Sequence, residues 1–267
     1  MTNKEIKERW DNYRKANTDK PLVRNRELKE VFNLLNPKDG EIILEVGTGN
    51  GYLTLPIAQA VGGGRVVTAD VSQDNLKSVT NQNVKNNLPV ETFLFNDKDL
   101  FTTFPESYFD AVATIATLHH FDNRLNQTGE NGRISVLKEF YRLLKIGGRL
   151  VVADVAHGTI SQKYFDAIDN PKHCFPTGHP HDFFSIVRLN EILGEIGFKN
   201  INIEIKRVPW QFESREDAEN FVHTIHNAKC LPYESFELAE KYLSFVKNNN
   251  YYELGWELFF VIAEKKE

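Results

Sequence analysis

Cysteine is scarce in this chain of 267 residues, which contains only Cys174 and Cys230. The two are well separated and form no C-x-x-C pair, so the sequence predicts neither a disulfide framework nor a cysteine zinc site. Two free thiols are typical of a protein from a reducing compartment.

Long apolar segments and an excess of basic residues are also missing. No run approaches the roughly 18 to 20 apolar residues that a membrane helix needs, and residues 1–5 contain no apolar signal core. The formal net charge of −5 lacks the electrostatic signature of proteins that hold phosphate backbones. We therefore expect a cytoplasmic protein that acts neither on nucleic acid nor in a membrane.

The most informative motif present is residues 42–51, which indicate a buried strand followed directly by a glycine-rich loop. Gly47, Gly49 and Gly51 would let the backbone turn sharply and approach a ligand closely. The helix that follows, at about residues 52–60, would direct its free N–H groups at that ligand. A dinucleotide loop, G-x-G-x-x-G, needs a glycine where this chain has Tyr52. The loop therefore predicts a different nucleotide-like cofactor.

With Glu45 two residues ahead of Gly47, the loop reads E-x-G-x-G-x-G and resembles the first motif of class I S-adenosylmethionine (SAM)-dependent methyltransferases. Further segments resemble that family in the same order, and together they cover roughly residues 40–155: Asp70 at the end of 66–70, then 109–112, then Leu118-His119-His120, then 144–150. The resemblance implies SAM as cofactor. It also implies an α/β, Rossmann-like, doubly wound and mostly parallel seven-stranded sheet with an antiparallel last strand.

Strand-like runs alternate with helical patterns, which independently predicts β-α-β units and a parallel sheet. The expected strands are residues 42–46, 65–70, 92–96, 110–115, 149–155, 201–208 and 256–263. About 45 residues separate the last two strands. The capping-box pattern from Ser214 predicts one amphipathic helix there, and the apolar spacing from Phe236 to Val246 predicts a second. Residues 156–185 show no clear periodicity, so we interpret them as a long functional loop.

These patterns predict three parts. Residues 1–38 would form an N-terminal helical cap. Residues 39–208 and 253–267 would form the SAM-binding core. Residues 209–252 would form a helical insertion that acts as a substrate lid.

Candidate cofactor ligands follow from the carboxyl ends of the strands. Asp70 can accept hydrogen bonds from both ribose hydroxyls, and Glu45 from the cofactor ammonium or nearby backbone N–H groups. The resemblance implies an acid for the adenine amino group, which we assign to Asp97, with Asn96 and Asp99 as alternatives. The candidate cofactor-binding residues are Glu45, Gly47, Thr48, Gly49, Gly51, Tyr52, Asp70, Val71, Asp97 and Thr114.

Residues 113–117 lack the Asn/Asp-Pro-Pro-Tyr motif of exocyclic-amine methyltransferases, whereas Leu118-His119-His120 resembles the small-molecule branch of the family. Methyl transfer is an in-line displacement, so a general base is optional. His119 and His120 are the candidate catalytic residues, and the alternative is that one caps the sheet and the other packs beneath the cofactor.

Three further histidines, His157, His179 and His181, lie in residues 156–185 and are candidate substrate contacts. Convergent imidazoles could also hold a cation, but loop spacing alone does not show convergence, and we assign no metal.

The sequence thus predicts a SAM-dependent methyltransferase with a small-molecule acceptor. A non-catalytic SAM-binding protein remains an alternative, because its cofactor motifs would look the same. An NAD-dependent oxidoreductase is a further alternative, disfavoured by Tyr52 and by the absence of a Tyr-x-x-x-Lys pair. The acceptor atom and the oligomeric state are left open.

Overall fold

The computed structural model describes residues 11–17, 19–20, 22–95, 102–124, 127–169, 172–174 and 182–267. Its contacts divide the chain into two compact units. The first combines Met1–Glu27, Val155–Phe183 and Ile205–Leu258, and the second combines Leu28–Asp154, Phe184–Glu204 and Phe259–Glu267. The segment after residue 155 and the insertion near the C-terminus therefore belong to the same unit, although the sequence separates them.

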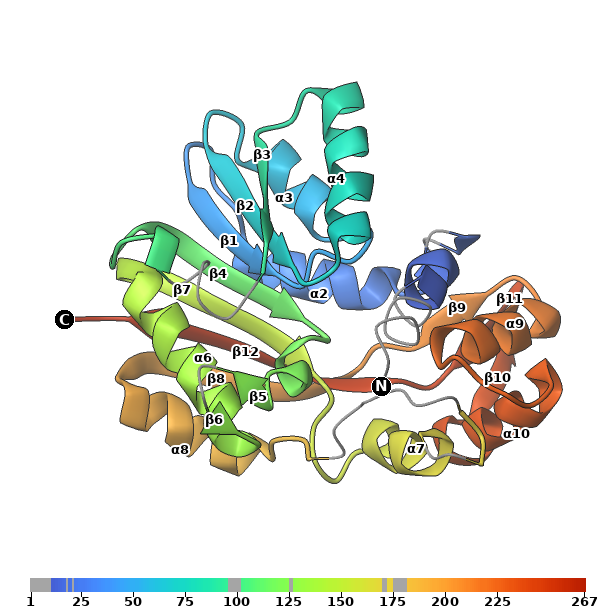
Figure 1. Ribbon diagram of the computed structural model, residues 1–267. Helices are drawn as coiled ribbons and strands as arrows, with labels where there is room; N and C mark the ends of the chain where they lie inside the picture. The colour runs from blue at the N-terminus through green and yellow to red at the C-terminus, as the bar shows by residue number, and fades with distance from the viewer. Residues whose placement is uncertain are drawn as a thin grey trace. The chain divides into compact units, whose positions relative to one another are not determined.

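The second unit is built on a seven-stranded sheet of order β3-β2-β1-β4-β7-β12-β8 (Figure 1). The strands of this sheet are β1 (Ile42–Val46), β2 (Arg65–Asp70), β3 (Val90–Leu94), β4 (Phe109–Ile115), β7 (Leu144–Asp154), β8 (Phe198–Arg207) and β12 (Glu257–Lys265). The last three residues of β8 and the first two of β12 are counted with the first unit. β1 pairs in parallel with both β2 and β4, while β12 runs antiparallel to β7. The predicted fold class is confirmed, and the strand order reverses direction at β1.

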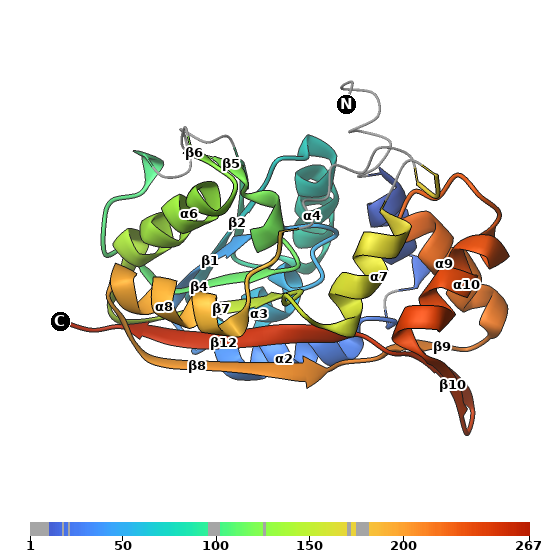
Figure 2. The ribbon, with the colours of Figure 1, turned by 90° about the horizontal axis from the view of Figure 1, so that it is seen from below.

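Helices join these strands as the alternating pattern predicts. They are α2 (Asn25–Leu35), which begins in the first unit, then α3 (Thr54–Ala60), α4 (Gln73–Asn86), α6 (Glu130–Leu143) and α8 (Ile186–Ile196). The Ser72 side chain caps the start of α4, and Gly197 ends α8 in the left-handed region. α6 and α8 lie side by side (Figure 2).

The central strands are buried along most of their length, which explains their continuous apolar sequence. The side chains of Val67, Val112 and Val151 are completely buried. Two short elements follow β4 in the chain. They are a 3-10 turn, η1 (Leu118–His120), and a small hairpin of β5 (Asn123–Arg124) and β6 (Gln127–Thr128). The core of this unit therefore holds the carboxyl ends of β1, β2, β4 and β7 rigidly in place.

The first unit contains more regular structure than the sequence pattern predicts. The expected helices of the insertion are α9 (Arg215–Ile225) and α10 (Pro232–Leu243), and Ser214 caps α9 as predicted. A three-stranded antiparallel sheet, order β10-β11-β9, was not expected; its strands are β9 (Trp210–Phe212), β10 (Phe245–Asn248) and β11 (Tyr251–Leu254).

The interpretation of residues 156–185 as a long loop is wrong in part, because α7 (Ile160–Ile168) lies within them. The side chain of Thr159 caps this helix by accepting a hydrogen bond from the backbone of Gln162. Tyr164 and Ile168, one turn apart on α7, are completely buried. The segment with helical spacing is short, and the glycine, proline and histidine residues around it hide the pattern in the sequence.

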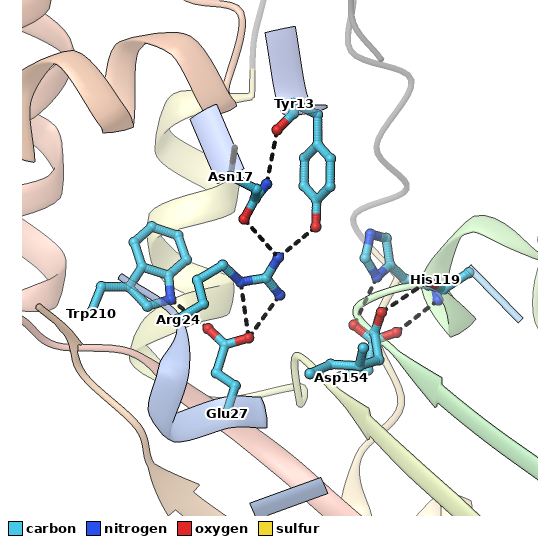
Figure 3. A network of polar contacts seen from close by, with 9 residues as sticks. Tyr13, Asn17, Arg24, Glu27, His119, Asp154 and Trp210 are labelled. Atoms are coloured by element: carbon cyan, nitrogen blue, oxygen red, sulfur yellow. Dashed lines mark hydrogen bonds and ion pairs between the residues drawn. The ribbon is translucent and has the colours of Figure 1, made fainter. Parts of the chain in front are cut away.

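A buried polar network joins the N-terminal segment to β9 within the first unit (Figure 3). Arg24 donates two hydrogen bonds to Glu27, at 3.0 and 2.7 Å, and Trp210 donates its indole N–H to the other carboxylate oxygen. The guanidinium also contacts Tyr13 and Asn17. Because Glu27 is fully buried, its charge is stable there only with these donors in place.

Candidate active site

The glycine-rich loop begins where β1 ends, and each of its glycines has a positive φ. A Cβ on Gly47 would lie 2.2 Å from the hydroxyl oxygen of Thr117, and one on Gly51 would lie 2.9 Å from Val79. Both glycines are therefore required by the packing of the protein itself. A Cβ on Gly49, in contrast, would meet no atom within 4 Å, so this glycine leaves open space in which a ligand could approach the backbone.

Asp70, the last residue of β2, clasps this loop. Its carboxylate accepts hydrogen bonds from the backbone N–H of Gly49 at 3.0 Å and of Ser72 at 2.8 Å, and from the amide of Asn75 at 3.2 Å. The side chain is 8% exposed. A carboxylate held in this way beside the open side of Gly49 suits the predicted role of binding ribose hydroxyls, because its orientation is fixed in advance.

Glu45 has different partners from those expected. Its side chain is completely buried and accepts hydrogen bonds from the hydroxyls of Thr54 and Thr68, the latter at 2.8 Å, rather than from backbone N–H groups. Burial raises the pKa of Glu45 to about 7. The hydrogen bonds from the two hydroxyls lower this pKa and the charge of Asp70 raises it, but burial is the largest cause. Its contact with the cofactor ammonium stays a prediction.

The remaining cofactor candidates divide into buried and accessible positions. The hydroxyl of Thr48 lies 2.6 Å from that of Thr68, and Thr114 donates its hydroxyl to the carbonyl of Val46 at 2.8 Å. Both are buried, so the structure gives them roles in holding β1, β2 and β4 together. Tyr52 is half-buried and Val71 is 46% exposed beside Asp70. Asp97, with Asn96 and Asp99, lies outside the described residues.

At the carboxyl ends of β4 and β7, His119 faces Asp154 (Figure 3). The backbone N–H of His119 donates to one oxygen of Asp154 at 3.0 Å, and the ring nitrogen Nδ1 lies 2.7 Å from the other. Their side chains are 5% and 2% exposed. His120 is half-buried, with its ring centroid 4.0 Å from that of His119. Of the two candidate bases, the structure therefore shows His119 held by a buried acid.

The loop that carries His119 is supported from α6. Arg133 is 1% exposed, its Nε lies 3.3 Å from the carboxylate of Asp122, and its guanidinium stacks over the ring of Phe184 at 4.6 Å. Gly132 allows this close approach, because a Cβ there would lie 2.5 Å from the carbonyl oxygen of Phe121. The loop after β4 is thus fixed by contacts from α6 as well as by Asp154.

Asp154 is a candidate site residue that the sequence analysis missed. A signal for it exists, since residues 66–70 and 150–154 both end a buried strand with Ala-Asp. Only the pairing of β4 with β7, in which Ile115 aligns with Ala153, brings Asp154 to His119. The two residues are 35 positions apart, so no local pattern links them.

The predicted substrate histidines are only partly described. His157 is exposed in the turn before α7, in the first unit, and its Nδ1 lies 3.3 Å from the amide of Gln162. His179 and His181 lie outside the described residues. Among the residues with described positions, no group of three His, Cys, Asp or Glu side chains could hold a metal ion. No helix in the described part of the chain is long and apolar enough to cross a membrane.

Residues 44–152 match the family model of the methyltransferase domain. Over 136 residues the chain is 29% identical to a ubiquinone/menaquinone biosynthesis C-methyltransferase of Hydrogenovibrio crunogenus, covering 49% of this chain and 48% of that protein. It is 27% identical over 193 residues to a demethylmenaquinone methyltransferase of Lactobacillus johnsonii, covering 66% and 75%. The chain thus spans about half the length of the first relative and three quarters of the second.

The fold is shared with solved structures as well. A Bacillus halodurans protein assigned as a methyltransferase superposes with a TM-score of 0.62 at 20% identity, covering 90% of this chain and 99% of that one. The sheet order, the glycine loop with Asp70 and the matching family model define a class I methyltransferase domain with SAM as its cofactor. Over residues 44–152 the chain is thus a methyltransferase domain of the class I SAM-dependent type.

Proposed function

We propose that the chain methylates a small-molecule acceptor by in-line displacement. The observation that carries this proposal is the arrangement of two groups at the carboxyl ends of the strands in the second unit. The glycine loop follows β1 and is held by Asp70 at the end of β2. His119 follows β4 and contacts Asp154 at the end of β7. Thr117, two residues before His119, lies directly against Gly47. A cofactor loop and an acid–base pair are thus neighbours on one sheet edge, which is where open α/β sheets bind ligands.

The residues fit the cofactor. Gly49 leaves its outer side open, and Asp70 presents an oriented carboxylate beside it. We infer that Asp70 holds the ribose hydroxyls and that the backbone from Gly47 to Gly51 lies against the cofactor's amino-acid part. SAM supplies an activated methyl group on a positively charged sulfur. The protein supplies orientation, which can provide most of the rate in a displacement of this kind.

The small-molecule acceptor is supported by the two quinone-biosynthesis relatives and by the absence of the Asn/Asp-Pro-Pro-Tyr motif after β4. The net charge of −5 gives no support to a nucleic-acid substrate. We further propose that the protein acts in the cytoplasm, and that the insertion at residues 209–252 contributes to acceptor selection. Tight binding to tRNA or duplex DNA at low salt would contradict the small-molecule part of this proposal.

Isothermal titration with S-adenosylhomocysteine (SAH) tests the cofactor site. Asp70→Ala removes a carboxylate that would accept two hydroxyl hydrogen bonds, each contributing roughly 1.5 kcal/mol or more, so we expect about a 100-fold loss of affinity. Asp74→Ala, an acid 40% exposed on the first turn of α4, is the matched control and should bind as wild type does. Equal SAH affinity in all three proteins, or a preference for NADH, would overturn the proposal.

A non-catalytic SAM-binding protein remains the second candidate, because a sensor would hold the cofactor with the same residues. A screen of phenols, other hydroxyl compounds, carbon acids, amines and thiols with SAM, read by formation of SAH, separates the two. SAH formed only together with a methylated product supports the enzyme. Tight SAH binding without turnover of any class supports the sensor.

A further inference from the structure

The contact between His119 and Asp154 fixes which ring nitrogen carries hydrogen. A backbone N–H can only donate, so the N–H of His119 makes one carboxylate oxygen of Asp154 an acceptor. The other oxygen lies 2.7 Å from Nδ1, a distance that requires a hydrogen between them. With Asp154 ionised, that hydrogen belongs to the ring. The neutral imidazole then has Nδ1–H and keeps its lone pair on Nε2.

The pair is also suited to gaining a proton. When Nε2 takes up a proton the ring becomes positive, and the carboxylate already hydrogen-bonded to Nδ1 stabilises that charge without moving. Both side chains are nearly excluded from water, which strengthens this interaction. The titratable group on the same turn is His120, whose ring lies beside that of His119.

We propose that Asp154 is a positioning residue that holds His119 with Nδ1 protonated, so that Nε2 takes a proton from the acceptor, and that the acceptor is therefore a hydroxyl compound or a carbon acid. This inference rests on the proposed function and narrows its substrate class. An amine attacks with a free lone pair and loses its proton after transfer, so it does not require a base in the transition state.

The step balances in atoms and charge. The acceptor's O–H or C–H bond breaks, and its proton passes to Nε2 of His119. The electron pair released on oxygen or carbon forms the new bond to the methyl carbon, while the pair of the broken methyl–sulfur bond remains on sulfur. The positive charge lost from sulfur reappears on the imidazolium beside Asp154, and His119 later returns the proton to water.

The tautomer can be measured without any acceptor. In uniformly ¹⁵N-labelled protein, long-range proton–nitrogen correlation spectra distinguish a ring nitrogen that carries hydrogen from one that carries a lone pair. Among the 8 histidines, the His119 signals are those missing from His119→Gln. We expect hydrogen on Nδ1 and a lone pair on Nε2 in the neutral ring of the wild type. Hydrogen on Nε2 would overturn the proposal, even if the enzyme methylates small molecules.

Kinetics tests the catalytic half with Asp154→Asn and the acceptor from the screen. We expect kcat to fall by about 100-fold or more, with SAH affinity unchanged within about threefold. Asp110→Asn is the matched control, since Asp110 also accepts one backbone N–H, from Ile42, and one side-chain donor, Lys145, but lies at the opposite end of β4. Its kcat should stay within about threefold of wild type.

The outcomes separate the two levels of proposal. Turnover of amines or thiols only, or an unchanged kcat in Asp154→Asn, would reject the acceptor class while the methyltransferase function stands. Absence of SAH binding in the wild type would reject the proposed function, while the tautomer measurement would still report on the pair. If Asp154→Asn fails to fold, the wild-type spectrum alone decides whether His119 is held as proposed.

Discussion

Two neighbouring parts of one sheet edge are built by different means. The cofactor edge, defined as residues 47–51 with Asp70, is made of backbone: positive-φ glycines and N–H groups that donate to one carboxylate. The acceptor edge, defined as His119 with Asp154, depends on one pair of side chains at the ends of two strands. Backbone architecture leaves a contiguous motif in the sequence, whereas a side-chain pair leaves two separate residues. The two edges should therefore respond differently to substitution.

The largest effect is expected from Gly47→Ala, which attacks the backbone of the cofactor edge. The new Cβ would collide with the Thr117 side chain at 2.2 Å, and φ of +97° is strained for alanine. We expect SAH affinity to fall by about 100-fold or more and the free energy of unfolding to fall by roughly 3 kcal/mol. Titration calorimetry and denaturant unfolding measure these two quantities.

Gly40→Ala is the matched control for that substitution. Gly40 has a comparable φ of +84°, but a Cβ there meets nothing within 4 Å. It should cost only the strain of a left-handed alanine, about 1 to 2 kcal/mol, without loss of SAH affinity. Equal effects of the two substitutions on SAH binding would show that the contact with Thr117 does not shape the cofactor edge.

Much of the fold was predictable because its signals are local. β1 and β2 have the predicted bounds, and the capping role of Ser214 is confirmed. α7 was missed because a helix of nine residues offers only about two and a half turns of periodicity among turn-forming residues. The three-stranded sheet was missed because its strands have only three or four residues each.

The candidate site divides along the same line. Gly49 and Asp70 could both be assigned to the cofactor site from sequence alone, since Gly49 follows β1 and Asp70 ends the adjacent parallel strand β2. Asp154 could not, because its relation to His119 exists only after β7 pairs with β4. The partners of Glu45 were also beyond the sequence, because hydroxyls from α3 and β2 reach its carboxylate inside the core.

A second, smaller effect concerns the buried acid beneath the cofactor edge. Burial raises the pKa of Glu45 to about 7, against 4.5 for the exposed group, so the folded protein binds a proton that the unfolded chain releases. Stability from this group is therefore full below about pH 4.5 and is lost as pH rises toward 7. The 2.5-unit difference corresponds to at most about 3 kcal/mol. Glu45→Gln should remove this dependence.

The measurement is the difference in unfolding free energy between wild type and Glu45→Gln, from denaturant curves at several values between pH 5 and 8. The wild type should lose stability relative to Glu45→Gln as pH rises. Glu41→Gln is the control of opposite sign: burial alone would raise the pKa of Glu41, but hydrogen bonds from Arg149 and from the backbone of Lys38 lower it overall. Its difference should stay flat over this range. If the difference between wild type and Glu45→Gln does not change with pH, the pKa of Glu45 is not raised in the folded protein.

The smallest effect separates a structural from a cofactor role for Thr114, which lies where the two edges meet. Its buried hydroxyl donates to the carbonyl of Val46 and so ties β4 to the end of β1. Thr114→Val should lower the unfolding free energy by about 1 kcal/mol, while SAH affinity stays within about threefold. Thr114→Ser keeps the hydroxyl and should recover much of that stability. A tenfold loss of SAH affinity in the valine variant, recovered by serine, would instead place Thr114 among the cofactor ligands and extend the cofactor edge across β4.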